Sequence, residues 1–153
     1  MSIEKKLQSL EIVLPAPASP AGNYVPWVVV DNMAYIAGQT PRYGVDRRIT
    51  GKLGLDLTIV QGQDAARLCA LNILAQLRAA CGGDLDRVVR CVRLTGFVNC
   101  TPEFDEHPAV INGASDLMVA VFGEAGRHAR TALGANMLPG GAACEIESLF
   151  QIR

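Results

Sequence analysis

The residues best suited to chemistry lie near the C-terminal end of the chain. Arg130 begins an apolar segment, and a guanidinium there can hold a carboxylate through two parallel hydrogen bonds. Glu145 and Glu147 lie two positions apart in a second apolar segment, so both side chains point to one side of a strand, roughly 7 Å apart. Neighbouring carboxylates raise each other's pKa, which suits proton transfer or the orientation of a water. The alternatives are a surface ion pair for Arg130 and a solvated strand face for the two glutamates.

The spacing of the cysteines and histidines does not support metal or disulfide chemistry. The five cysteines are an odd number, no two are spaced as CxxC, and the only histidines are His107 and His128. This pattern does not fit a zinc site, so we predict no metal and five reduced thiols, as in a cytoplasmic protein. Both histidines are expected to be solvated or helix-capping. Cys81 and Cys100, near the ends of predicted elements, are the thiols that an alternative function as a redox switch would use.

Length and composition indicate one globular domain over residues 1–153. Lys and Arg number 14 and Asp and Glu number 15, for a net charge of −1, without the basic excess of a nucleic-acid-binding protein. Hydrophobic residues make up 50% and charged residues 19%, which excludes intrinsic disorder and favours an oligomer that covers part of its surface. The apolar runs are too short to span a membrane, and the first residues contain no apolar signal core.

The first third of the chain contains one clear pair of strands. Residues 1–14 are expected to form a short helix or an arm, and the Pro-rich stretch 14–24 forms a loop. Two apolar runs around Asp31-Asn32 predict a β-hairpin over 27–38. The polar stretch that follows, QTPRYGVDRRITGKLG, is interpreted as a solvated loop. It carries four basic residues: Arg42, Arg47, Arg48 and Lys52.

Two helices are predicted, one on each side of a strand at 85–98. Thr58 and Gln61 form a capping box that starts the first helix, which ends at a Gly-Gly pair. The second helix begins with Pro108 in its first turn. Gly113 inside the second helix costs about 1 kcal/mol relative to Ala, so it could mark the close approach of another backbone.

The C-terminal segments are interpreted as a second hairpin. Pro139-Gly140-Gly141 is a turn signal, and a Gly-Gly loop there places Glu145 opposite Asn136. Arg130 then lies roughly 20 Å along the strand from that pair. Both charged residues can therefore belong to one site only if they come from different chains. The core face of this hairpin is predicted to carry Leu133, Ala135, Met137, Cys144, Ile146 and Phe150.

The resulting element order is β-β-α-β-α-β-β. Antiparallel hairpins at both ends and two helices between them predict an α+β domain, with two helices packed on one face of a mostly antiparallel sheet. Four stretches, AGNYVPWV, YIAGQTP, VINGASDLMVAVFG and above all RTALGANMLPGGAACEIE, resemble the RidA/YjgF family of reactive-intermediate (imine/enamine) deaminases. The resemblance extends from about residue 15 to the C-terminus. Five residues match site residues of that family, and a sixth site position holds Ala132. The five are Arg130, Glu145, Tyr24, Gly38 and Asn112.

The resemblance implies a chorismate-mutase-like fold assembled as a homotrimer, with sites between subunits. It implies hydrolysis of small 2-imino or enamino acids, such as 2-iminopropanoate, to the 2-oxo acid and ammonia, without a metal or organic cofactor. Arg130 would bind the substrate carboxylate, and Glu145 would be the acidic site residue. Many members have Ser where this chain has Ala37 and Cys where it has Ala132, so only backbone groups can bind ligand at these positions.

The residues alone leave other interpretations open. Tyr24 could pack against Trp27 instead of closing a pocket, and Asn112 could lie on the polar side of its helix. The same arginine would also serve a non-catalytic trimer that binds a small carboxylate and regulates a partner. Ribonuclease activity or inhibition of translation is the weakest alternative, because the charge is balanced and no histidine pair is clustered.

Overall fold

The computed structural model describes residues 1–45 and 47–153. Its helices and strands are α1 (Ile3–Ser9), β1 (Trp27–Val30), β2 (Met33–Gln39), β3 (Arg42–Tyr43), β4 (Arg47–Arg48), α2 (Ile59–Ala80), β5 (Val88–Asn99), α3 (His107–Phe122), β6 (Ala129–Ala135) and β7 (Cys144–Ile152). Short 3-10 turns occur at Leu85–Arg87, Gly123–Gly126 and Pro139–Gly141. The expected hairpin of the first strands and the N-terminal short helix are both present.

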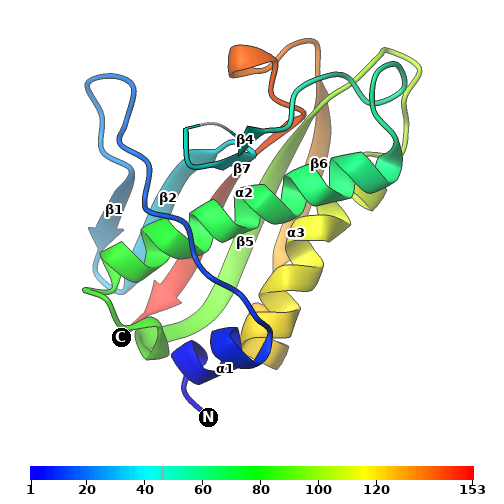
Figure 1. The fold of residues 1–153 in the computed structure, drawn as a ribbon. Helices are drawn as coiled ribbons and strands as arrows, with labels where there is room; N and C mark the ends of the chain where they lie inside the picture. Colours follow the sequence, from blue (N-terminus) through cyan, green and yellow to red (C-terminus); the bar gives the residue numbers. More distant parts are fainter. Residues whose placement is uncertain (46) are drawn as a thin grey trace.

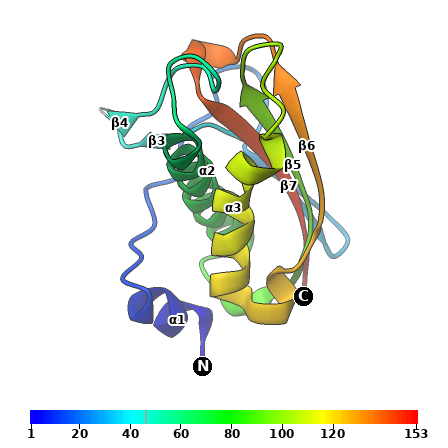
Figure 2. The ribbon, with the colours of Figure 1, turned by 90° about the vertical axis from the view of Figure 1, so that its right-hand side faces the viewer.

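The sheet has the strand order β1-β2-β7-β5-β6, and α2 and α3 cover one of its faces (Figure 1, Figure 2). β3 and β4 form a separate two-stranded ribbon. β5 and β6 run parallel, with α3 as the crossover between them, and the other neighbouring strands are antiparallel. This architecture confirms the predicted α+β class, with two helices on one face of a mostly antiparallel sheet.

Local sequence signals place the two long helices. Thr58 Oγ1 accepts a hydrogen bond from the Gln61 backbone, and the Gln61 side chain accepts one from the Thr58 backbone, as the capping box predicts. Pro108 lies in the first turn of α3. A Cβ atom at Gly113 would lie 2.8 Å from the carbonyl carbon of Gln63 in α2. Glycine is therefore required for the close approach of the two helices.

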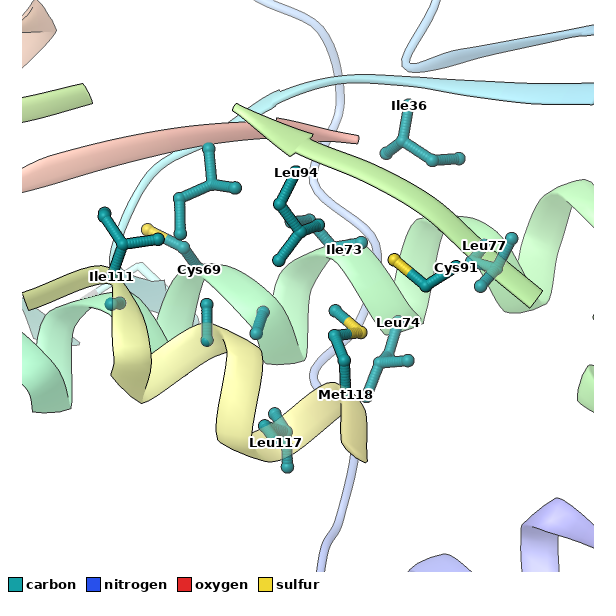
Figure 3. Close-up of a cluster of buried hydrophobic side chains, with 14 of the residues drawn as sticks. Ile36, Cys69, Ile73, Leu74, Leu77, Cys91, Leu94, Ile111, Leu117 and Met118 are labelled. Atoms are coloured by element: carbon teal, nitrogen blue, oxygen red, sulfur yellow. The ribbon is translucent and has the colours of Figure 1, made fainter. Parts of the chain in front are cut away.

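The core fills the space between the sheet and the two helices (Figure 3). It includes Cys69, Ile73, Leu74 and Leu77 of α2, Ile111, Leu117 and Met118 of α3, and Ile36, Cys91 and Leu94 of the sheet. All five cysteines are buried, and Sγ of Cys69 lies 3.6 Å from Sγ of Cys144. All five belong to the core, including Cys81 and Cys100, the thiols that a redox switch would use.

The predicted C-terminal hairpin is wrong. β7 lies between β2 and β5, whereas β6 pairs with the other side of β5, so β6 and β7 are not neighbours. Leu133 and Met137, expected in the core, are 49% and 59% exposed, while Ile146 and Phe150 are fully buried as expected. The 3-10 turn at Pro139–Gly141 reverses the chain, but the returning strand crosses to the far side of β5. The alternation of apolar and polar residues along a strand does not show which other strand it pairs with.

The sheet face away from α2 and α3 is not covered by a helix among the described residues, as Figure 2 shows from the side. Val28, Val30, Tyr35 and Leu133 lie on this face and are 46%, 53%, 50% and 49% exposed. No helix among the described residues is long and apolar enough to cross a membrane.

Candidate functional site

Arg130 lies on the edge strand β6, on the side of the sheet that faces α3. It is paired with Leu94 of β5, which is fully buried beneath the helices. Arg130 Nη1 donates hydrogen bonds to Asn112 Oδ1 at 2.8 Å and to Ser115 Oγ at 3.1 Å, both on α3. The helix therefore fixes the orientation of the guanidinium. Ala132 lies on the same face two residues along, packed against the core.

His128 extends this network, which we call the arginine cluster: Arg130, Asn112, Ser115 and His128. His128 Nδ1 lies 2.7 Å from the carbonyl oxygen of Gly126, and Nε2 lies 2.9 Å from Ser115 Oγ. The pKa of His128 is lowered from its ordinary value of 6.5, chiefly by burial. The hydrogen bond to the Gly126 carbonyl opposes this shift, and the charge of Arg130 adds to it. The neutral ring therefore donates a hydrogen bond from Nδ1 to the Gly126 carbonyl and accepts one from the Ser115 hydroxyl at Nε2.

The sequence did not identify the roles of Ser115 and His128. His128 is half-buried, so the prediction of a solvated residue is wrong, but its ring hydrogen-bonds the last carbonyl of the 3-10 turn Gly123–Gly126, as a capping residue would. His107 is the first residue of α3, and its Nε2 lies 3.3 Å from Sγ of Cys100. The spacing of Asn112 and Ser115, which puts both on one side of a helix, was the signal available for Ser115.

Glu145 lies on β7 between Cys144 and Ile146, both fully buried against the helices. Its side chain consequently projects from the other, helix-free side of the strand. Burial raises the pKa of the Glu145 carboxyl above its ordinary value of 4.5, and the charge of Glu147 raises it further. A Cβ atom at Gly38 would lie 3.1 Å from Cδ of Glu145, so the carboxyl group fills the space left by this glycine.

Glu145 and Gly38 line a cavity of about 310 Å³ beside the point where the β2–β7 register shifts, between Ile36 and Gln39. Tyr24 also lines this cavity, and its hydroxyl accepts a hydrogen bond from the Ala21 backbone at 3.3 Å. We call it the glutamate cavity. The lining also includes Ala37, Arg42, Arg48 and Gly140.

Two polar side chains of α2 hold the walls of the glutamate cavity in place. Gln76 Nε2 donates to the carbonyl oxygen of Ala18 at 2.9 Å, which fixes the Pro-rich loop before β1. Asn72 Nδ2 donates to the carbonyl oxygens of Thr40 at 3.1 Å and Arg42 at 2.6 Å. Both amides are almost fully buried. Buried amide groups need hydrogen-bond partners, and here the partners are backbone carbonyls of the cavity wall. These bonds hold the wall in a fixed position.

The six site positions expected from the sequence fall into two separate groups. Arg130, Asn112 and Ala132 lie at or beside β6, whereas Tyr24, Gly38 and Glu145 line the glutamate cavity. β5 separates β6 from β7, and Arg130 aligns three residues away from Glu145, which corresponds to about 14 Å between their Cα atoms. Their side chains also project from opposite faces of the sheet. One chain does not bring both groups to a single small molecule.

Metal ligands do not cluster within residues 1–45 and 47–153, where no three His, Cys, Asp or Glu side chains are placed to hold an ion. The expected absence of a metal stays a prediction.

Comparison with known proteins gives strong similarities over nearly the whole chain. Residues 4–151 match the family model described as "YjgF/chorismate_mutase-like, putative endoribonuclease". Protein TCP17 of Trypanosoma cruzi is 50% identical over 151 residues, which cover 98% of this chain and 94% of that protein.

Solved structures show the same similarity. Atu1372 of Agrobacterium tumefaciens, a protein of unknown function, is 45% identical with a TM-score of 0.91, covering 99% of this chain and 92% of that one. A "putative endoribonuclease" of Shewanella oneidensis is 36% identical with a TM-score of 0.95, covering 99% and 100%. RidA from a Psychrobacter species is 28% identical with a TM-score of 0.61, covering 90% and 94%.

Proposed function

This chain belongs to the YjgF/RidA family, and from that premise we propose that it hydrolyses small 2-imino or enamino acids to 2-oxo acids and ammonia. The observation that carries the proposal is the glutamate cavity. It places a partly buried carboxyl group, with a raised pKa, in a hollow large enough for a small acid. The name RidA of one structural relative supports the same reaction class.

Arg130 is proposed to bind the substrate carboxylate. A guanidinium has five N–H donors, and the bonds to Asn112 and Ser115 engage those of Nη1. Nη2 and Nε can then present the two parallel donors that a carboxylate accepts. Since α3 already fixes the guanidinium, little conformational freedom is lost when the substrate binds.

Glu145 is proposed to handle the protons of the reaction. Its carboxylate accepts a proton from the water that attacks the iminium carbon, and the C–O bond forms as the C=N electrons move to nitrogen. The same proton is returned to the amine of the carbinolamine. The Glu145 carboxylate then takes the hydroxyl proton as the C=O bond forms and the C–N bond breaks. Ammonia leaves with the 2-oxo acid and takes this last proton as ammonium. A raised pKa suits both directions of transfer, because it lies closer to neutral pH than that of an ordinary carboxyl.

The site is proposed to form between subunits of a homotrimer. In such an assembly the arginine cluster of one chain would meet the glutamate cavity of its neighbour, which accounts for their separation within one chain. The uncovered apolar side chains on the helix-free sheet face, such as Val28, Tyr35 and Leu133, support burial against other copies.

The test is ammonia release from freshly generated imines of several amino acids. Arg130→Ala should abolish the catalysed rate, while Arg127→Ala serves as the matched control, since Arg127 is an exposed residue paired with Glu124. Arg130→Lys should also be poor, because an ammonium cannot make the bidentate contact. Full activity in a folded Arg130→Ala protein would contradict the proposed mechanism.

Two alternatives use the same fold. A non-catalytic carboxylate-binding trimer with a regulatory role would bind through Arg130 but turn nothing over, so the ammonia assay separates it from the enzyme. Endoribonuclease activity is favoured by the names of the matched family and of the Shewanella protein. RNA cleavage that survives purification, and that Arg130→Ala abolishes, would support the ribonuclease function.

A further inference from the structure

Two arginines face each other across the β3–β4 ribbon. Arg42 and Arg48 are direct cross-strand partners, as are Tyr43 and Arg47. Direct partners project on the same side of a ribbon, and like charges in this position repel. Arg42 and Arg48 both line the glutamate cavity. Two like charges on the same side of a ribbon at the wall of a cavity are the arrangement expected of a site for an anion.

The backbone that carries this pair is anchored to the body of the protein. Asn72 donates to the carbonyl of Arg42 at 2.6 Å, and the segment after β4 pairs with the segment before β7. In that pairing, the backbone of Ala143 donates to Ile49 at 3.1 Å and that of Gly51 donates to Gly141 at 3.0 Å. The ribbon is therefore attached to the strand that carries the Glu145 side chain.

The charge of the glutamate cavity is positive on balance. Its lining residues include two arginines and one glutamate, so even an ionised Glu145 leaves one positive charge among them. A substrate that reaches Arg130 with its own carboxylate would leave Arg42 and Arg48 without a counterpart unless its side chain is also anionic. A cationic or long apolar side chain would be disfavoured in this environment.

We propose that the glutamate cavity selects imino acids with a second carboxylate, and that this distal carboxylate bridges Arg42 and Arg48. The inference rests on the proposed function and names its substrate class as 2-imino dicarboxylic acids of four or five carbons. Two guanidiniums can each donate to one carboxylate, and the bridging anion removes their mutual repulsion. The cavity of about 310 Å³ has room for an acid of this size.

The kinetic test compares two imines that differ in charge but hardly in shape. 2-Iminoglutarate and the corresponding imine of glutamine, each generated in place by an amino-acid oxidase, would be assayed with wild type, Arg48→Gln and Arg47→Gln. Arg47 is the matched control, because it lies on the same strand, carries the same charge and pairs with Tyr43 instead.

Wild type should favour the acidic imine in kcat/KM by about tenfold or more. Arg48→Gln should abolish that preference, chiefly through the KM for the acidic imine, because the contact is remote from the reacting carbon. Arg47→Gln should keep it. Equal use of both imines by wild type, or equal effects of the two substitutions, would overturn the inference. Arg42→Gln repeats the test should Arg48→Gln fail to fold.

A binding measurement separates this inference from the proposed function. Titration calorimetry with glutarate and butyrate should give tighter glutarate binding to wild type by about tenfold, and no preference with Arg48→Gln. If glutarate is preferred in an Arg48-dependent way but no imine is hydrolysed, the dicarboxylate site stands and the deaminase function fails. If neutral imines are hydrolysed but glutarate is not preferred, the deaminase function stands and the dicarboxylate site fails.

Discussion

A Cβ atom on residue 38 would lie 3.1 Å from Cδ and 3.2 Å from Cγ of Glu145. Gly38 does not have a positive φ, so its backbone conformation is open to any residue. The glycine is therefore required by the space that the Glu145 side chain occupies. Through this contact, β2 determines where the carboxyl group on β7 lies.

Gly38→Ala should therefore displace Glu145 while leaving the fold intact. We expect kcat/KM for imine hydrolysis to fall on the order of 100-fold, because a shift of about 1 Å in a reacting group has effects of this size. The double variant with Gly38→Ala and Glu145→Gln should be no less active than Glu145→Gln alone, since both changes act on one group. Independent, multiplying losses, with an unchanged circular dichroism spectrum, would show that Gly38 acts through something other than Glu145.

The pH dependence of turnover should follow the raised pKa of Glu145. If the carboxylate accepts a proton from water, activity falls as pH drops below that pKa, so the acidic limb should lie above pH 4.5. Burial is the larger cause of the shift and the charge of Glu147 the smaller. Glu147→Gln should therefore move the limb to lower pH without abolishing it. An unchanged acidic limb would show that the charge of Glu147 does not contribute to the raised pKa of Glu145.

The free energy of unfolding should also depend on pH through Glu145, and the raised pKa fixes the direction of this dependence. The folded-state pKa of Glu145 exceeds the unfolded-state value, so its contribution to stability is fully present below pH 4.5 and is lost as pH rises through the raised pKa. Thermal unfolding of Glu145→Gln should lack this part of the pH dependence. Identical pH profiles of Tm for the variant and wild type would contradict the raised pKa.

Gly113→Ala should destabilise the packing of α2 against α3. Its Cβ would meet the backbone of Gln63, which cannot move aside without shifting the helix. We expect a loss of about 1–3 kcal/mol in the free energy of unfolding, despite the better helix propensity of alanine. Gly62→Ala is the control, since its Cβ would meet only side-chain carbons of Leu53 at 2.9 Å and Val110 at 3.2 Å. Equal denaturation midpoints for the two variants would contradict this view.

Thiol titration should find five free thiols per chain in denaturant without reductant. In the native protein they should react slowly, because burial raises the pKa of Cys91 to about 12 and raises that of Cys100 as well. Three thiols instead of five would indicate a disulfide, for which Cys69 and Cys144 are the nearest pair. Elemental analysis should find no stoichiometric metal.

The sequence predicted the parts of the fold that depend on local signals. The Thr58 capping box, the turn at Asp31-Asn32 and the close approach at Gly113 all appear where expected, because each depends on a few neighbouring residues. Strand pairing at the C-terminus depends on distant segments. The segment order strand 85–98, helix, strand at Arg130 is also the pattern of a parallel crossover, but the Pro-Gly-Gly turn favoured the hairpin.

The candidate site was predicted unevenly for the same reason. Arg130 and Glu145 were recognisable from their types and spacing, whereas the arginine pair was not, because the polar stretch after β2 was interpreted as a solvated loop. Cross-strand pairing brings Arg42 and Arg48 together, and Asn72 of α2 holds the backbone of Arg42 beside the cavity. Neither effect is encoded in the composition of the stretch. The predicted hairpin already separated Arg130 from Glu145. In the structure that hairpin is absent, and the two residues are apart because β5 lies between β6 and β7.

Mixed oligomers of two inactive variants test the central claim, that the arginine cluster and the glutamate cavity act together from different chains. Arg130→Ala and Glu145→Ala would be mixed after reversible dissociation and reassembled, with subunit exchange verified by mass. In an equal mixture, about one quarter of the interfaces should contain both native residues, so about one quarter of the wild-type activity should return. Failure to recover activity, with exchange demonstrated and both parents inactive, would contradict the claim that the site is shared between chains.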